Sequence, residues 1–122
     1  MTSEIPHDDG GQLKTVQDGL LPGEQVVAVY DLKGTGTGFV GLTDRRVIVQ
    51  DNSLVGRKIA LTSLPYKRIY SVSLLSDGSI LGQFTSPSTV VLQVSSKLFE
   101  LEFRGDVKAR HVHDVVLHYI TA

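Results

Sequence analysis

The feature that most constrains this chain is the alternation of apolar and polar residues through most of its length. Residues 97–104 show it clearly, because apolar Phe99, Leu101 and Phe103 alternate with charged neighbours. A period of two is typical of an antiparallel strand with one face on a core and one in water. Turn-forming residues separate seven such segments: 25–33, 35–43, 46–51, 57–63, 69–75, 89–95 and 97–104. The chain is therefore expected to be mainly β.

The apolar period changes to that of a helix after Gly105. The helical stripe comprises Ala109, Val112, Val116, Tyr119 and Ile120. Asp106 is the predicted N-cap of this helix. A weaker helical pattern spans residues 12–21 and stops at Leu21-Pro22-Gly23. Residues 1–11 are predicted to form a flexible tail, followed by a single domain over residues 12–122.

Seven strands followed by one C-terminal helix resemble the pleckstrin-homology superfold. Three segments are similar to the bacterial pleckstrin-homology-like family over about residues 12–120: Leu20–Glu24, Gly41–Val49 and Leu64–Val72. The resemblance implies a small barrel or sandwich of about seven antiparallel strands capped by one α-helix, with a short N-terminal helix. It also implies a non-catalytic binding or scaffolding module, and relatives in bacteria assemble into homo-oligomeric rings.

Charge and composition exclude several classes of protein. The 12 Lys and Arg residues nearly balance the 13 Asp and Glu residues, so a role in neutralising nucleic acid is not expected. The absence of cysteine removes disulfides, thiolate metal sites and cysteine nucleophiles. The polar N-terminus does not resemble a signal peptide, and the longest apolar run is Val26–Tyr30. A cytoplasmic location is therefore expected.

No motif in the sequence predicts catalysis. There is no Gly-x-Ser-x-Gly elbow, and the histidines lack the i, i+4 spacing of a helical zinc site. The glycine-rich segment at residues 34–38 is followed by a strand pattern and lacks the Gly-Lys-Ser/Thr of a phosphate-binding loop. We therefore expect a protein that is not an enzyme, with no catalytic residue, metal or cofactor.

Both faces of the first three predicted strands are apolar, so something must cover the second face. One candidate cover is the N-terminal helix, through Leu13, Val16 and Leu20. The other is a second subunit, because large exposed apolar patches usually mark interfaces. One short helix is small for three strands, so the subunit is favoured. The predicted homo-oligomer interface comprises Val27, Val29, Phe39 and Ile48.

The segment 43–46 (Thr-Asp-Arg-Arg) has two interpretations. In the structural one, Thr43 or Asp44 accepts backbone N–H bonds in a turn, and one arginine pairs with a carboxylate. In the functional one, an arginine holds an anion. The candidate anion-binding residues are dispersed along the chain: Lys33, Arg45, Arg57 and Lys58.

Three classes of partner remain open at this point. Self-association is favoured. The alternatives are an anionic membrane surface or ligand, and an unidentified protein or peptide bound beside the C-terminal helix. Because the net charge is -1 and the basic residues are dispersed, lipid-headgroup binding ranks second.

Overall fold

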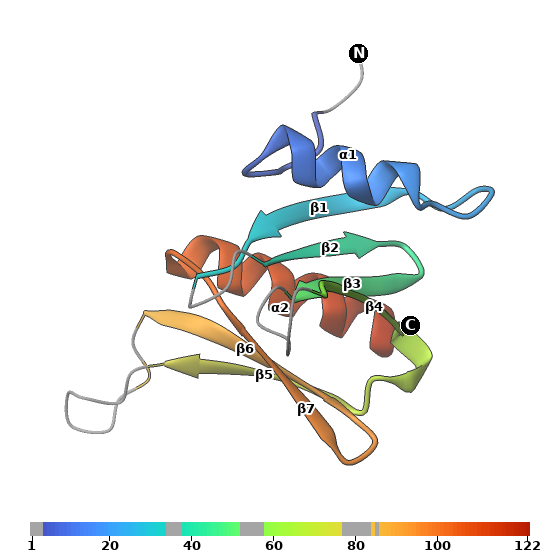
Figure 1. Ribbon diagram of the computed structural model, residues 1–122. Coiled ribbons are helices and arrows are strands. Elements are labelled where there is room, and N and C mark those ends of the chain that lie inside the picture. The colour runs from blue at the N-terminus through green and yellow to red at the C-terminus, as the bar shows by residue number, and fades with distance from the viewer. Residues whose placement is uncertain (1–3, 34–37, 52–57, 77–83, 85) are drawn as a thin grey trace. The chain divides into compact units, whose positions relative to one another are not determined.

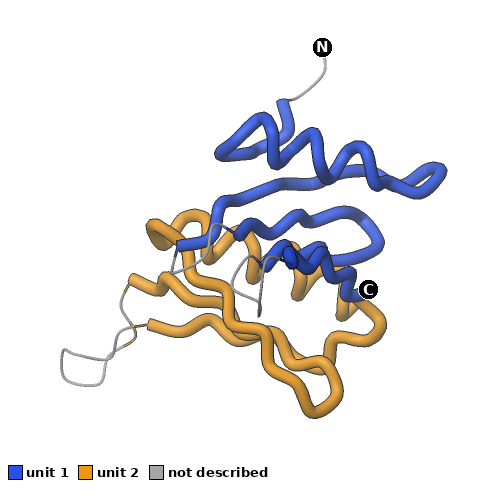
Figure 2. The backbone as a smooth tube through the Cα atoms, in the orientation of Figure 1, with its two compact units in different colours: residues 1–65 blue, residues 66–122 orange. Residues whose placement is uncertain are grey.

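The computed structural model describes residues 4–33, 38–51, 58–76, 84 and 86–122 (Figure 1). Contacts within the chain divide it into two compact units, residues 1–65 and 66–122 (Figure 2). Among the described residues, each unit contains one antiparallel sheet and one α-helix. None of the helices in this part of the chain is long and apolar enough to cross a membrane.

The first unit is built on a four-stranded sheet with both faces largely buried. The strands are β1 (Val26–Asp31), β2 (Phe39–Thr43), β3 (Arg46–Asp51) and β4 (Ala60–Pro65), in the order β1-β2-β3-β4. Neighbouring strands are antiparallel, and the register pairs Val29 with Gly41, Gly41 with Ile48, and Ile48 with Ser63. These four paired residues lie on one face of the sheet. The buried residues of the opposite face include Ala28, Val40, Leu42, Val47 and Leu64.

Helix α1 (Gly10–Asp18) covers the other face, which we call the outer face, and lies along β1 in Figure 1. Its N-cap is Asp9, whose carboxylate accepts the N–H of Gln12 at 3.0 Å. Val16 packs in one cluster with the buried outer-face residues Val29, Phe39 and Ile48. A Cβ on Gly41 would come within 2.7 Å of Val16 Cγ2. The missing side chain therefore lets α1 approach the sheet closely.

A bulge in β1 changes which valine faces the helix. The register between β1 and β2 shifts between Val26 and Ala28. One extra residue reverses the alternation of a strand, so Val26 packs against the cluster beneath α1. Val27, which the simple alternation places on the outer face, is the half-buried residue at the irregularity.

Residues 6–8 lie along the edge of β1. His7 bridges Val29 in parallel; the N–H of Val29 donates to the Pro6 carbonyl at 3.0 Å, and the N–H of Asp8 donates to the Val29 carbonyl at 3.2 Å. Helix α1 begins at Gly10. The structure therefore differs from the expected tail over residues 1–11, because backbone pairing and the helix begin inside that range.

The second unit combines a three-stranded sheet with the C-terminal helix. Its elements are η1 (Tyr66–Arg68), β5 (Ser71–Ser76), β6 (Pro87–Val94), β7 (Lys97–Glu102) and α2 (Asp106–Ile120), and the strand order is β5-β6-β7. Helix α2 packs against β5 and β6. The buried residues of the sheet, of the segment after it and of the predicted stripe of α2 are Val90, Leu92, Leu101, Phe103, Ala109, Val112 and Val116. Tyr66 and Tyr119 stack with ring centroids 4.7 Å apart.

Over the described residues, the expected seven antiparallel strands, C-terminal helix and short N-terminal helix are confirmed. The N-cap of α2 is a correction. The helix begins at Asp106 itself, and its N-cap is Gly105 (φ 119°), which offers no side-chain hydrogen bond. Asp106 instead lies in the first turn, where a carboxylate interacts favourably with the helix dipole.

Candidate functional site

A buried polar cluster of the first unit is centred on the carboxylate of Glu24. This side chain has no exposed surface and lies in the segment before β1. Arg46, at the start of β3, forms a bidentate pair with it: Nε donates to Oε2 at 2.8 Å and Nη2 donates to Oε1 at 2.9 Å. The Leu21 N–H donates to Oε1 at 2.9 Å, and the Thr43 hydroxyl donates to Oε2 at 2.7 Å. Four donors therefore hold one buried carboxylate.

These contacts determine the ionisation of Glu24. Hydrogen bonding from Arg46 is the main cause that lowers the pKa of Glu24, from its ordinary value near 4.5 to about 2. Burial acts in the opposite direction, and the Leu21 N–H, the Thr43 hydroxyl and the charge of Arg46 add to the lowering. The same pair raises the pKa of Arg46. Glu24 and Arg46 are therefore a permanent ion pair at neutral pH.

The turn between β2 and β3 uses the chemistry expected for residues 43–46. The Thr43 hydroxyl oxygen accepts the N–H groups of Arg45 and Arg46, both at 3.0 Å. The Asp44 carboxylate accepts the N–H of Gln25 at 3.0 Å. Together with the Arg46–Glu24 pair, these bonds confirm the structural interpretation of the segment.

Sequence reasoning did not single out Glu24 as the partner of Arg46. The available signal was an isolated acidic residue closing the motif Leu20-Leu21-Pro22-Gly23-Glu24.

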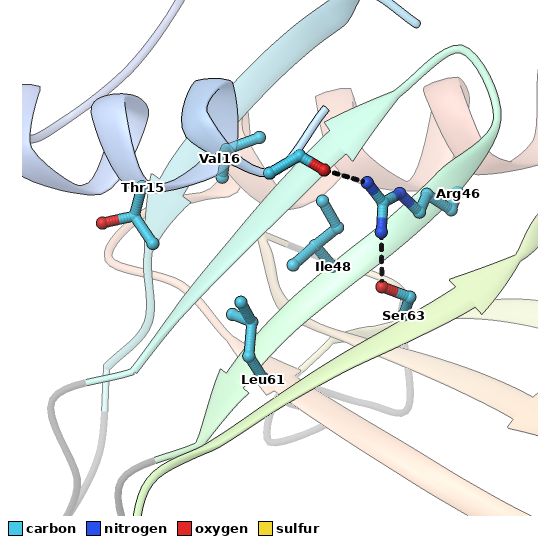
Figure 3. Close-up of a pocket in the computed structure, with 7 residues that line it drawn as sticks. Thr15, Val16, Arg46, Ile48, Leu61 and Ser63 are labelled. Atoms are coloured by element: carbon cyan, nitrogen blue, oxygen red, sulfur yellow. Dashed lines mark hydrogen bonds between the residues drawn. The ribbon is translucent and has the colours of Figure 1, made fainter. Parts of the chain in front are cut away.

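Arg46 also connects the end of α1 to β4, the last strand of the described sheet. Its Nη2 donates to the carbonyl oxygen of Gly19, the C-cap of α1, at 2.9 Å, and its Nη1 donates to the Ser63 hydroxyl of β4 at 2.8 Å (Figure 3). One guanidinium thus joins the end of the helix, the segment before β1 and strand β4. Its arrangement is that of a structural arginine whose donors are directed at protein acceptors.

A shallow pocket lies beside this guanidinium, between α1 and strands β3 and β4 (Figure 3). Its lining combines apolar and polar groups: Thr15, Val16, Gly19, Arg46, Ile48, Leu61 and Ser63. Its volume is about 60 Å³, far below the roughly 300–1,000 Å³ of pockets that hold drug-sized ligands. The pocket has room for a small alkyl group.

The outer face is uncovered where it reaches β4. Leu61 is 54% exposed, and Ile59, just before the strand, is 61% exposed. β4 is also the terminal strand of its sheet among the strands that the structure describes. We call Ile59, Leu61 and the outward edge of β4 the β4 margin. It is an apolar strip on the last strand of the described sheet, and it is the candidate interaction surface of the first unit.

The residues predicted as an oligomer interface do not lie on this margin. Val29, Phe39 and Ile48 are 0%, 2% and 3% exposed beneath α1, and Val27 is the half-buried residue of the bulge. The helix, the alternative cover considered from the sequence, thus occupies the face that had been assigned to a second subunit. The physical reason is Gly41, because the close approach of Val16 lets a nine-residue helix cover parts of three strands.

The anion-binding candidates divide between the two ends of the sheet. Arg45 lies in the β2–β3 turn, is exposed, and donates from Nη2 to the Pro22 carbonyl at 3.1 Å. Lys33 follows β1 and Lys58 precedes β4, so the strand register places both at the opposite end. Five strand residues at about 3.3 Å each separate the two ends. Arg57 and residues 34–37 of the glycine-rich segment lie outside the described residues.

Over the residues that the structure describes, no three His, Asp or Glu side chains come together as a metal site. The glycine-rich segment leads into β2, which begins at Phe39.

Comparison with known proteins identifies the fold. The family model described as "Bacterial PH domain" matches residues 6–120. The chain belongs to the bacterial PH domain family. This bacterial PH domain is also 31% identical over 101 residues to "Uncharacterized protein YozO" of Bacillus subtilis (strain 168), which covers 83% of this chain and 82% of the relative.

Two solved structures share the fold of this bacterial PH domain. A pleckstrin homology domain from Shewanella amazonensis SB2B matches 94% of this chain and 100% of its own, with a TM-score of 0.67 and 20% identity. A DUF1696 family protein with a pleckstrin-homology domain from Shewanella loihica PV-4 matches 93% of this chain and 98% of its own, with a TM-score of 0.61 and 18% identity. The pleckstrin-homology-like fold expected from the sequence is confirmed.

Proposed function

We propose that this chain is a non-catalytic binding module that self-associates, and that the β4 margin is the surface through which copies meet. The observation that carries the proposal is the exposure of Ile59 and Leu61, at 61% and 54%, on and just before β4, the last strand of the sheet among the described residues. Burying two such side chains from each copy provides a favourable apolar term. The assembled module then acts as a scaffold for protein–protein interaction.

Two features of the first unit support a binding role over a chemical one. The buried Glu24–Arg46 pair satisfies its hydrogen bonds within the protein, so it is committed to holding α1 and the sheet together. The pocket beside it is too small for a drug-sized substrate. The apolar margin is therefore the surface of this unit to which we assign the binding role.

Light scattering coupled to gel filtration at micromolar protein tests the proposal. We expect a mass that is a multiple of 13.3 kDa. Leu61→Asp is expected to shift the mass to that of a single chain, because a carboxylate cannot be buried in an apolar contact without a partner.

Leu98→Asp is the matched control. Leu98 is a leucine of β7 in the second unit that is 63% exposed, so it carries the same substitution at similar exposure. A wild-type chain that elutes only as a monomer rules out self-association. An oligomer that survives Leu61→Asp and dissociates with Leu98→Asp shows that the interface lies elsewhere.

A second candidate function is binding of an anionic lipid surface or ligand. It is favoured by one observation: exposed Lys33 and Lys58 lie at the same end of the four-stranded sheet. Each cation near an anionic membrane contributes about 1 kcal/mol. Flotation with phosphatidylserine vesicles should then show binding at low salt that weakens at physiological salt and in Lys33→Gln/Lys58→Gln. Equal flotation with neutral vesicles would contradict this function.

A further inference from the structure

The N-terminal segment of the first unit covers the outer face while burying few of its own side chains. We call residues 4–20 the strap, because they include both α1 and the segment that pairs with the edge of β1. Among the nine described residues of α1, Val16 alone is buried, and half-buried Leu13 and Leu20 pack beside it. The apolar burial that holds the strap in place is therefore small for a segment of this length.

Helix α1 also has little stability of its own. It contains nine residues, and isolated helices shorter than about 12 residues are marginal in water. It begins with Gly10 and Gly11, and glycine is a poor helix former. Its first turn carries no acidic residue and its last turn no basic one that would favour the helix dipole. We therefore expect α1 to unfold when it leaves the sheet.

The docked strap leaves one buried polar atom without a hydrogen bond. The side-chain amide of Gln12 donates from Nε2 to Oδ1 of Asp31 at 3.0 Å. Its Oε1 is buried and accepts no hydrogen bond from the residues that the structure describes. A buried acceptor without a donor is unfavourable, and release of the strap returns this oxygen to water.

Residues 21–23 are the place where the strap can turn away from the sheet. Gly23 has a φ of 81°, a left-handed conformation that glycine adopts without strain. Directly after it, Glu24 is fixed by its bidentate pair with Arg46. The same guanidinium donates to the Gly19 carbonyl on the other side of residues 21–23. Breaking that one bond releases the end of α1 while Glu24 stays in place.

We infer that the strap opens as one unit about residues 21–23 while the four-stranded sheet stays folded. Opening uncovers Phe39 and its buried neighbours beneath α1. The strand register places Phe39 in one row with Gln50 and Leu61, so the uncovered face is continuous with the β4 margin. The strap thus regulates how much apolar surface the first unit exposes. The opening concerns a single chain, so it stands or falls independently of self-association.

Native-state hydrogen exchange of the full chain tests the inference, because neighbouring amides of β1 have different partners. The Val29 N–H donates to the Pro6 carbonyl of the strap at 3.0 Å. Tyr30 pairs with Val40, and its amide points to β2, because successive residues of a strand direct their N–H groups to opposite edges. We expect Val29 and Val16 to share one protection factor, about tenfold or more below that of Tyr30.

Val49→Ala separates opening of the strap from unfolding of the chain. Val49 is buried and pairs with Val40, on the face that α1 does not cover. The substitution weakens the sheet equally whether the strap is closed or open. The protection of Tyr30 should therefore fall roughly tenfold, while that of Val16 and Val29 stays unchanged.

Asp9→Ala tests whether the strap moves as one unit. It removes the N-cap carboxylate that accepts the N–H of Gln12. The protection of Val16 and Val29 should fall together, by about fivefold, although Val29 belongs to the sheet. Asp114→Ala is the matched control, because this exposed carboxylate lies on α2 of the second unit and should leave both amides unchanged.

Thiol labelling tests whether opening exposes the covered face. The chain contains no cysteine, so Ile48→Cys and Val49→Cys each introduce a single thiol, on opposite faces of β3. Ile48 is the more deeply buried of the two, at 3% against 7%. A water-soluble maleimide should nevertheless react with Ile48→Cys about tenfold faster or more, because only that thiol is uncovered when the strap opens.

Four results would overturn the inference. Equal protection of Val16, Val29 and Tyr30, or a common fall of all three in Val49→Ala, means that α1 leaves only when the chain unfolds. A fall at Val16 without one at Val29 in Asp9→Ala means that residues 6–8 detach separately from the helix. Equal labelling of the two thiols means that the face beneath α1 does not become accessible.

Discussion

The outer face of the four-stranded sheet has a covered part and an uncovered part. Over β1 to β3, α1 buries Val29, Phe39 and Ile48, and Arg46 fixes the end of the helix. At β4, Leu61 points to the same side and is half-exposed. Both parts are apolar, so composition does not distinguish them. What distinguishes the two parts is how far one short helix extends over the sheet. An apolar face therefore belongs to the core where something covers it and to the surface where nothing does.

The largest expected effect comes from placing the same charge in each part. Val29→Asp puts a carboxylate beneath α1 with no partner, and should lower the free energy of unfolding by more than about 4 kcal/mol. Leu61→Asp should change it by less than about 0.5 kcal/mol. Denaturant unfolding measures both, at a concentration low enough to keep the chain monomeric. Similar losses of unfolding free energy in the two variants would show that the covered and uncovered parts do not differ.

The next effect concerns the arginine that holds the cover in place. Arg46→Met leaves the buried Glu24 carboxylate unpaired and should cost about 3 kcal/mol or more in chemical denaturation at pH 7. Adding Glu24→Gln to that variant should recover part of the loss, because the unpaired charge is removed. A loss below about 1 kcal/mol, within the range of an exposed pair, would show that the ion pair is not needed to keep α1 docked.

Acid should weaken the covered part through the same pair. The folded state lowers the pKa of Glu24 from near 4.5 to about 2. The stabilisation is therefore fully present above pH 4.5 and is lost as the pH falls towards 2. The full shift corresponds to about 3 kcal/mol.

Unfolding free energies of the wild-type chain and Glu24→Gln, measured from pH 6 to pH 2.5, isolate this contribution. The other carboxylates titrate in both proteins, so the difference between the two curves belongs to Glu24. The difference should shrink towards low pH. Parallel curves over that range would contradict the lowered pKa.

The smallest expected effect tests why one helix suffices as a cover. Gly41→Ala introduces a Cβ that would lie 2.7 Å from Val16 Cγ2, and should destabilise the protein by about 1–3 kcal/mol. Gly10→Ala is the control, because its Cβ has no atom within 4 Å. Thermal or denaturant unfolding of Gly41→Ala with Val16→Ala should reveal coupling between the two sites. Additive losses would mean that close approach at Gly41 is unimportant.

Local patterning in the sequence predicted most elements of the fold. Residues 46–51 were expected as a strand, and β3 has those bounds. The apolar stripe of α2 was also correct, since Ala109, Val112 and Val116 are buried. The bounds of a strand differ from the expected ones where local propensity and pairing with the neighbouring strand disagree. β4, for example, was expected at 57–63 and runs from Ala60 to Pro65, because its pairing with β3 extends to Arg46.

The candidate site was less accessible to sequence reasoning. The pattern at residues 43–46 predicted turn bonds and an arginine–carboxylate pair, and both are present. It did not identify the carboxylate, because Glu24 lies 22 residues from Arg46 in the chain. The bulge after Val26 was also invisible, and one extra residue exchanges the faces of every side chain beyond it.

The sequence by itself determined the number, type and order of the elements, because alternation and helical periodicity are local properties of a chain. It also determined that the first three strands are apolar on both faces. Only the tertiary structure decided what covers the second face. That outcome depends on the absent side chain of Gly41, the position of Val16 above it and the reach of Arg46 to Gly19. These contacts join residues distant in the chain, and no local pattern encodes their geometry.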